Sequence, residues 1–142
     1  MAISQTTCTS FKVELFKGEH DFDTDEFKLA LYTSSASLGA STTAYSTSNE
    51  VSGSNYTAGG NVLTVATTFP KSINTTAIVD FNNTSWTNAT FTARGALIYN
   101  NTHTSKAAVA VLDFGSDRSA SSSTFEIQFP IANADDAILR IT

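Results

Sequence analysis

The side chains of this 142-residue chain that could support chemistry are few, and five of its 13 acidic residues lie in one run, at residues 19–26. Asp21, Asp23 and Asp25 occupy alternate positions, as carboxylates do at the start of a calcium-binding loop. The rest of that pattern is missing, because its sixth position is Glu26 instead of glycine and its twelfth is Tyr32 instead of an acidic residue. We therefore expect no bound metal and predict a solvated acidic connection.

Hydrolysis by a nucleophile needs a base beside the nucleophile and a third group that orients the base. The chain has two histidines, His20 and His103, and no Gly-x-Ser-x-Gly elbow. His103 lies in a polar loop of asparagine and threonine, which favours a solvent-exposed turn. A glycosidase would need a carboxylate pair, and no spacing favours one among Asp80, Asp113, Asp117 and Glu126. We expect no catalytic residues and no enzymatic activity.

Aromatic side chains among hydroxyl and amide groups are a third possible source of function. Trp86, Tyr45 and Tyr56 lie among many asparagines and threonines, a combination that carbohydrate-binding sandwiches use. The alternative is that Trp86 fills one edge of the core, while the polar turns keep a weakly charged surface hydrated. The sequence leaves both interpretations open.

Arg94 lies next to Gly95 in a predicted strand that is otherwise rich in apolar residues, where a buried unpaired charge would be costly. If the flanking strands pair as an antiparallel hairpin through residues 100–105, Arg94 lies opposite position 111 or 112 and Asp113 becomes a diagonal neighbour. We predict a structural ion pair between Arg94 and Asp113, with Asp80 as the other option. The alternative is a solvent-facing arginine without a partner.

The elements that must position these groups are predicted to be almost all β. Short segments of alternating apolar and polar residues recur between clusters of Asn, Ser and Gly, which is typical of a β-sandwich or barrel. We expect strands at residues 27–32, 61–67, 77–81, 91–99, 106–114, 124–129 and 137–141, with turn clusters at 82–85, 100–105 and 115–123. Residues 107–112 are apolar throughout and predict a central strand buried on both faces. The predicted fold is all-β, a single jelly-roll-like β-sandwich of about eight strands.

At most one short helix is expected, over residues 11–17. Phe11 and Leu15 share a helical face, Ser10 is a good N-cap and Gly18 stands where a helix stops. A first strand is the alternative, because Phe11, Val13 and Leu15 also share one face of a strand. We expect residues 1–10 to form an extended N-terminal arm and residues 11–142 to form the β-sandwich domain.

Composition narrows the classes of function. The chain has 8 Lys and Arg against 13 Asp and Glu, so it offers no basic surface for nucleic acid or for an anionic membrane. No segment approaches the ~20 apolar residues of a membrane span, and residues 1–10 lack the features of a signal peptide. The single cysteine, Cys8, cannot form an internal disulfide.

A series of short motifs runs through nearly the whole chain. They are Phe11-Lys12-x-Glu14-Leu15, His20-x-Phe22, Phe27-Lys28-x-Ala30-Leu31-Tyr32-Thr33-Ser34, Thr43-Ala44-Tyr45, Glu50-Val51-x-Gly53, Tyr56-Thr57-Ala58-Gly59-Gly60, Ala93-Arg94-Gly95-Ala96-Leu97-Ile98-Tyr99 and Ala110-Val111-Leu112-Asp113-Phe114-Gly115-Ser116. In this order the motifs resemble those of small virion structural proteins of tailed bacteriophages.

The resemblance implies a non-enzymatic virion protein, and first a capsid decoration, or cement, protein that binds the outer capsid surface and stabilises the shell. Its partners would be the major capsid protein and copies of itself, as a homotrimer, without nucleic acid, membrane or cofactor. Ile3, Thr6 and Thr7 of the arm suit an extended strand that contacts the capsid or a neighbouring copy. The alternative is a tail-fibre or receptor-binding module that recognises host surface glycan through Trp86, Tyr45 or Tyr56.

Overall fold

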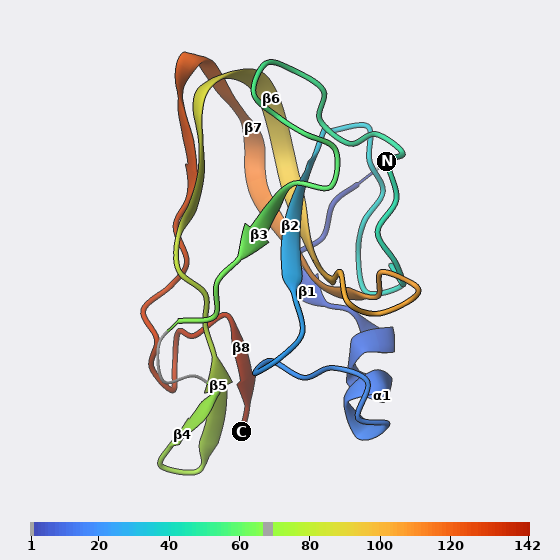
Figure 1. The fold of residues 1–142 in the computed structure, drawn as a ribbon, viewed down its shortest axis with the longest axis vertical. Coiled ribbons are helices and arrows are strands. Elements are labelled where there is room, and N and C mark those ends of the chain that lie inside the picture. The colour runs from blue at the N-terminus through green and yellow to red at the C-terminus, as the bar shows by residue number, and fades with distance from the viewer. Residues whose placement is uncertain (1, 67–69) are drawn as a thin grey trace.

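Two antiparallel sheets and one short helix make up the protein in the computed structural model, which describes residues 2–66 and 70–142 (Figure 1). The larger sheet has the order β1 (Thr6–Thr7), β7 (Ala108–Ile127), β6 (Thr84–Asn100), β2 (Phe27–Tyr32) and β3 (Asn61–Leu63). The smaller sheet has the order β4 (Lys71–Ile73), β5 (Thr76–Val79) and β8 (Leu139–Ile141). The helix is α1 (Thr9–Phe16). The prediction of an all-β, sandwich-like fold with one short helix is confirmed.

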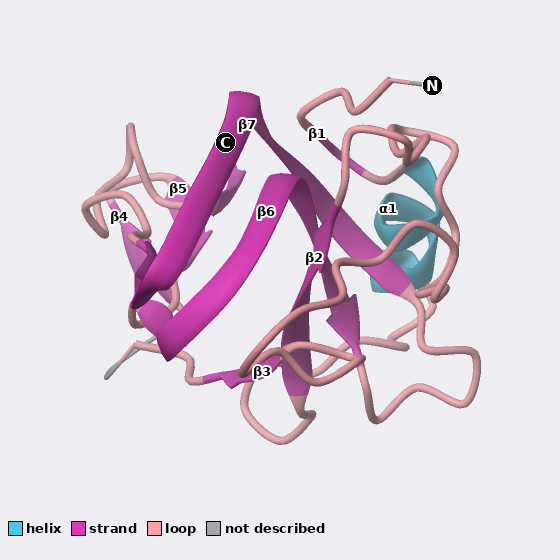
Figure 2. Ribbon diagram, turned by 90° about the horizontal axis from the view of Figure 1, so that it is seen from above, coloured by secondary structure: helices cyan, strands magenta, loops and turns pink. Residues whose placement is uncertain are grey.

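The long hairpin of β6 and β7 is the scaffold of the larger sheet and curls along the molecule (Figures 1 and 2). The first half of β6 alternates buried and exposed residues, so one of its faces meets solvent. From Gly95 to Asn100 every residue is buried, and β7 is likewise buried from Ala108 to Val111. This confirms the central strand that the apolar run at residues 107–112 predicts.

The predicted turn at residues 115–123 is wrong, because this segment continues β7 as part of one 20-residue strand. Its extra residues are absorbed as bulges: β6 advances two residues from Ala93 to Gly95, while β7 moves from Arg118 to Asp113. Gly115, with φ +80°, and Ser122, with φ 47°, supply the left-handed backbone that such irregularities need. Residues that look like a turn therefore bend a strand instead of ending it.

Strand β3 is shorter than the predicted segment 61–67. Its ladder with β2 ends at Leu63, and the chain then pairs with the segment after β5, through Ala66 N–H to Asp80 O and Asn82 N–H to Thr64 O. The ladder with β2 ends early because the chain changes its pairing partner after Leu63. Residue 67 lies outside the described residues.

Helix α1 confirms the predicted helix but begins two residues earlier. Cys8 is the N-cap and makes no side-chain capping bond, so Ser10 lies inside the helix and does not cap it. The start is set by β1, because Cys8 N–H donates to Val109 O directly after the Thr6–Thr7 ladder. Gly18 ends the helix at φ +72° and donates its N–H to Leu15 O.

Candidate functional site

An apolar groove of about 680 Å³, the helix groove, lies between α1 and the smaller sheet. Its walls come from Phe11, Leu15 and Phe16 of α1, from Phe22 and from residues of β5 and β8. Phe16 is 96% exposed although it is a large aromatic side chain. The charged residues that line the groove are Lys12 and Arg140, both cationic, in a chain whose net charge is −5.

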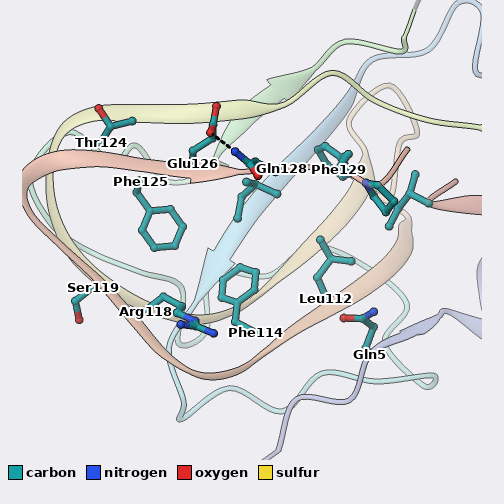
Figure 3. Close-up of a pocket in the computed structure, with 13 residues that line it drawn as sticks. Gln5, Leu112, Phe114, Arg118, Ser119, Thr124, Phe125, Glu126, Gln128 and Phe129 are labelled. Atoms are coloured by element: carbon teal, nitrogen blue, oxygen red, sulfur yellow. Dashed lines mark hydrogen bonds between the residues drawn. The ribbon is translucent and has the colours of Figure 1, made fainter. Parts of the chain in front are cut away.

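A second pocket of about 500 Å³, the β7 groove, is lined by both halves of the curled strand β7 (Figure 3). Phe114 and Phe125 face it, with ring centroids 6.2 Å apart. Its polar groups are partly engaged within the chain, because Gln128 donates to Glu126 at 2.9 Å. The pocket therefore combines aromatic surface with polar groups at its margin.

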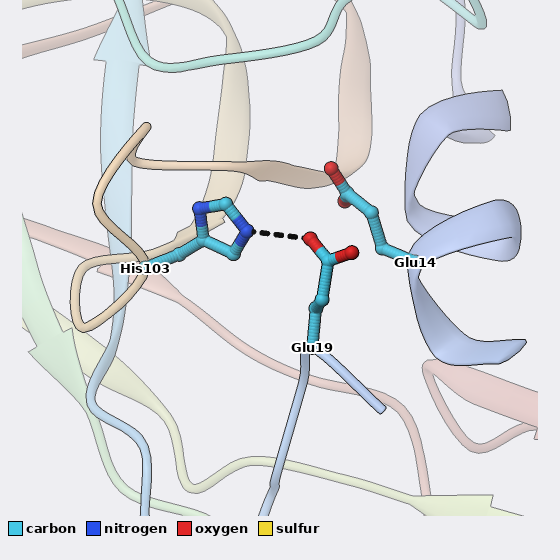
Figure 4. A group of neighbouring side chains, drawn as sticks. All are labelled: Glu14, Glu19 and His103. Atoms are coloured by element: carbon cyan, nitrogen blue, oxygen red, sulfur yellow. Dashed lines mark hydrogen bonds and ion pairs between the residues drawn. The ribbon is translucent and has the colours of Figure 1, made fainter. Parts of the chain in front are cut away.

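A network of histidines, carboxylates and one amide, the histidine latch, joins α1 and residues 18–26 to the loop between β6 and β7. Its members are Glu14, Glu19, His20, Asp25, Asn100 and His103. His20 Nε2 lies 2.9 Å from Glu14 Oε1, and His103 Nε2 lies 2.9 Å from Glu19 Oε1. The carboxylates of Glu14 and Glu19 approach His103 from the helix and from the chain that follows it (Figure 4). The His20 and His103 rings stack with centroids 5.8 Å apart.

The hydrogen bonds of Asn100 determine the tautomer of His20. Asn100 Oδ1 accepts the backbone N–H groups of Thr102 and His103, at 3.0 and 3.2 Å, so its Nδ2 must face the other way. Nδ2 donates to His20 Nδ1 at 3.0 Å and to Asp25 Oδ2 at 2.8 Å. Because Nδ1 accepts, the proton of neutral His20 lies on Nε2.

His103 has the same tautomer for an independent reason. The backbone N–H of Ser105 donates to His103 Nδ1 at 3.1 Å, so Nδ1 carries no proton. Its Nε2–H then donates to Glu19, and this bond holds the pKa of the Glu19 carboxyl below its usual value. Both histidines are thus neutral donors to glutamate.

Glu14, Glu19 and His103 bring oxygen and nitrogen atoms within 4.8 Å of one another, which raises the question of a metal ion. A metal would need the lone pair of His103 Nε2, and a ligating histidine normally donates its Nδ1–H to an outer partner. Here Nδ1 accepts from Ser105 and Nε2 carries the proton. The network as arranged does not fit a cation, and the absence of a metal remains a prediction.

The acidic run that resembles a calcium loop bonds to its own backbone. Asp25 Oδ2 accepts Asp21 N–H, and Asp21 Oδ1 accepts Asp23 N–H. Asp25 also accepts from Asn100, which lies far along the chain. The exposed turn bonds at Asp21 and Asp23 agree with a solvated connection, while Asp25 belongs to the histidine latch.

The three aromatic residues considered for glycan binding have partners within the chain. Trp86 is buried against Phe125, and Tyr45 stacks on Tyr99. The hydroxyls of Tyr45 and Tyr56 both donate to Glu50, at 2.6 Å.

Glu50 also accepts Gly59 N–H, and Tyr56 Oη accepts Leu31 N–H of β2. Burial raises the pKa of both tyrosines, and the bond to Glu50 raises it further. These groups fasten the long segment 34–60 onto β2. They position structure and do not form the wall of either groove.

Arg94 and Asp113 lie together, with Arg94 Nε 3.4 Å from Asp113 Oδ1. The register differs from the expected one: Leu97 pairs with Val111 and Gly95 pairs with Asp113, because Tyr99 already pairs with Ala108 and the ladder shifts by one more residue between Tyr99 and Ile98. Arg94 therefore sits at a bulge. Asp80 is elsewhere in the core, where burial raises the pKa of its carboxyl, and its Oδ2 has no hydrogen-bond partner among the described residues.

The N-terminal arm packs on its own chain. Thr6 pairs with Val111 and Thr7 with Ala110, so β1 extends the sheet at the edge of β7. Ile3 is buried over Gly95, where an added Cβ would lie 2.9 Å from the Ile3 side chain. The structure thus gives these three residues contacts within the chain, and β1 remains the outermost strand of the larger sheet.

The sequence predicts a solvent-exposed turn around His103 and gives no indication of a contact between His103 and His20. The structure brings them together in a part-buried network, and it makes the buried Asn100 the centre of that network. The signal in the sequence was only an asparagine at the end of an apolar strand. Since Asn100 also begins a predicted turn cluster, its composition alone did not distinguish it from Asn101.

No family model matches this sequence, no curated protein matches it, and no solved structure matches its fold. Within the described residues no helix is long and apolar enough to cross a membrane.

Proposed function

We propose that this chain is a non-enzymatic virion structural protein of a tailed bacteriophage, a capsid decoration protein that docks on the outer surface of the major capsid protein and stabilises the shell. The observation that carries the proposal is the helix groove with the exposed Phe16 at its side. A contiguous apolar groove on a polar surface marks a site of protein interaction. The motif resemblance supplies the class of partner.

The charge of the helix groove specifies the partner further. Its charged lining residues, Lys12 and Arg140, are cations on an acidic chain. An apolar segment of capsid protein that carries carboxylates beside its apolar side chains would fill the groove and complement these two charges. Such a contact needs no catalytic group.

The proposal includes assembly as a homotrimer on the capsid, with the arm in the contact between copies or with the capsid. Strand β1 supports this part because it is the outer edge of the larger sheet. An open edge offers backbone N–H and C=O groups to a neighbouring strand. Three such contacts on one trimer raise the effective concentration of each, so that weak contacts give firm binding.

Co-sedimentation with capsids that lack this protein tests the docking. Phe16→Asp places a charge at the groove, and Val13→Asp is the matched control, because Val13 is 50% exposed on the same helix and does not line the groove. We expect Phe16→Asp to weaken particle binding at least about tenfold, a loss of about 1.4 kcal/mol, and Val13→Asp to bind like the parent.

Two results would contradict the proposal at different levels. Full occupancy by Phe16→Asp would show that the helix groove is not the docking face. No binding of the parent protein to any capsid, with only a few copies per particle, would contradict the decoration role itself.

The β7 groove favours a second candidate, a tail-fibre or receptor-binding module that recognises host surface glycan. Its aromatic rings and the side chains of Arg118 and Glu126 are the combination that sugar sites use. We therefore assign this candidate's glycan site to the β7 groove and not to Trp86, Tyr45 and Tyr56. Glycan-array binding that Arg118→Ala abolishes would support this candidate over decoration. A copy number of hundreds per particle would support decoration.

A further inference from the structure

The geometry points to a proton-controlled latch, in which neutral His20 and His103, each protonated on Nε2, fasten α1 and residues 18–26 to the β6–β7 loop, and in which acid opens these contacts. Each ring bonds through both nitrogens. Nε2 donates to a glutamate, and Nδ1 accepts from Asn100 at the end of β6 in His20 and from Ser105 of the loop in His103. The latch is a property of the isolated chain. Only its consequence for docking rests on the proposed function.

Protonation at Nδ1 cannot be accommodated without breaking a bond. At His20 the new N–H would face the Nδ2 hydrogens of Asn100, and the amide cannot turn, since its Oδ1 already accepts two backbone N–H groups. At His103 the new N–H would face the backbone N–H of Ser105. The closed latch therefore requires both rings to be neutral, whereas in the open state each ring can be neutral or protonated. Added protons consequently favour the open state.

The charged groups around the two rings act in the opposite direction and must be weighed. Glu14 from α1, and Glu19 and Asp25 from the connection, attract an imidazolium, while Lys17, which lies 3.9 Å from Glu19, repels it. Glu14 and Glu19 are partly exposed, so solvent weakens their attraction. The rings also stack on each other, so two imidazolium charges would repel at 5.8 Å. The fixed donors at Nδ1 therefore decide the direction.

The latch holds two walls of the helix groove. The Phe11 ring of α1 lies 4.8 Å from the His20 ring, and Phe22 packs edge-on against Phe11 at 6.1 Å. Both phenylalanines line the groove. If the groove docks on a capsid, opening the latch at low pH loosens the docking face.

The first test assigns the tautomers directly, by long-range proton–nitrogen correlation of the histidine rings in the purified protein at pH 8. We expect both rings to be neutral, with the hydrogen on Nε2. A hydrogen on Nδ1 of either ring, or an imidazolium at pH 8, would overturn the proposal. This test needs no variant and no partner.

The second test measures opening through Cys8, which is the only cysteine, is fully buried and occupies the N-cap position of α1. Burial raises the pKa of its thiol to about 11, with Glu14 nearby adding to the effect. Because the labelling rate also depends on the ionisation of the thiol, we define protection at each pH as the labelling rate of the denatured chain divided by that of the folded chain. We expect the protection of Cys8 to fall at least about tenfold from pH 8 to pH 5.5, because protonation removes one or two hydrogen bonds.

The matched variant is His20→Gln combined with His103→Gln, which keeps an N–H donor toward each glutamate and cannot gain a proton. Its Cys8 protection should be lower and independent of pH. Protection that is independent of pH in the parent, or an equal pH dependence in the variant, would overturn the latch. If the double variant does not fold, His103→Gln alone is used, because His103 is the more exposed of the two rings. It should halve the change in Cys8 protection between pH 8 and pH 5.5, on a logarithmic scale. Failure to bind capsids would leave all of these results unaffected.

Discussion

His20 and His103 stack their rings with centroids 5.8 Å apart and planes 23° from parallel, although they lie on opposite sides of β2 in the sequence. The contact forms because the loop after β6 returns beside the chain that leaves α1. Asn101 N–H and Glu26 O close the same junction. Two loops that each look like solvated turns therefore make one ordered polar cluster.

Asn100→Ala should be among the most destabilising substitutions in the polar part of the molecule. The side chain is fully buried and bonds to His20, Asp25 and two backbone N–H groups. Leaving these groups without partners should lower the free energy of unfolding by about 3 kcal/mol, measured in urea. Asn101→Ala is the control: its amide bonds to Glu26 at an exposed site, and its loss should cost less than about 1 kcal/mol. Equal losses would contradict the central position of Asn100.

Asp80→Asn should stabilise the protein at neutral pH. Burial raises the pKa of the Asp80 carboxyl, although its bond from Phe81 N–H acts in the opposite direction. The folded state therefore binds this proton more tightly than the unfolded state, and the parent loses stability as the pH rises from about 4 toward the folded pKa. The variant should match the parent near pH 4 and exceed it at pH 8 by on the order of 1 kcal/mol. A difference that does not change with pH would show that the carboxylate is not penalised by burial.

Gly60→Ala and Gly18→Ala should separate backbone strain from steric overlap. Both glycines have positive φ, but a Cβ at Gly60 would overlap the carbonyl oxygen of Leu29, while one at Gly18 meets nothing within 4 Å. Gly18→Ala should cost about 1 kcal/mol through strain alone. Gly60→Ala must also move β2 and should cost about 3 kcal/mol or more. Similar melting temperatures for the two variants would contradict this packing at Gly60.

Arg94→Ala and Asp113→Asn should each have a small effect. The pair is 3.4 Å apart and partly exposed, and Arg94 Nε has no aligned hydrogen bond among the described residues. We expect a coupling of about 0.5 kcal/mol in a double-mutant cycle, reduced in 1 M salt. A coupling above about 2 kcal/mol would mean that the bulge places these charges in a much drier site.

Local pattern was sufficient for much of the fold. Short apolar segments between turn-like clusters identified β2 and the end of β7 around Phe125, where buried and exposed residues alternate. The apolar run at residues 107–112 identified the part of β7 that is buried on both faces. Helix α1 followed from the spacing of Phe11 and Leu15 and from Gly18. These features depend on neighbours within a few residues.

The sequence also supported the choice of Asp113 near Arg94, but not the register, which depends on bulges that turn-like residues conceal. Gly115 and the serines after it have the composition of a loop, yet they continue a strand because β6 pairs with Arg118, Ser119 and Ala120 beyond the bulge at residues 114–117.

The histidine latch and both grooves were decided by tertiary structure alone. Asn100 and Asn101 are adjacent residues of the same type. Only Asn100 is buried between α1, residues 18–26 and the hairpin, and there its amide is needed to satisfy the hydrogen bonds of its neighbours. The tyrosines and Trp86 have the composition of a binding site, but Glu50 and the core occupy them. A side chain becomes a site through the groups that surround it, and those groups here come from segments that are distant in the chain and meet only when the sheets close.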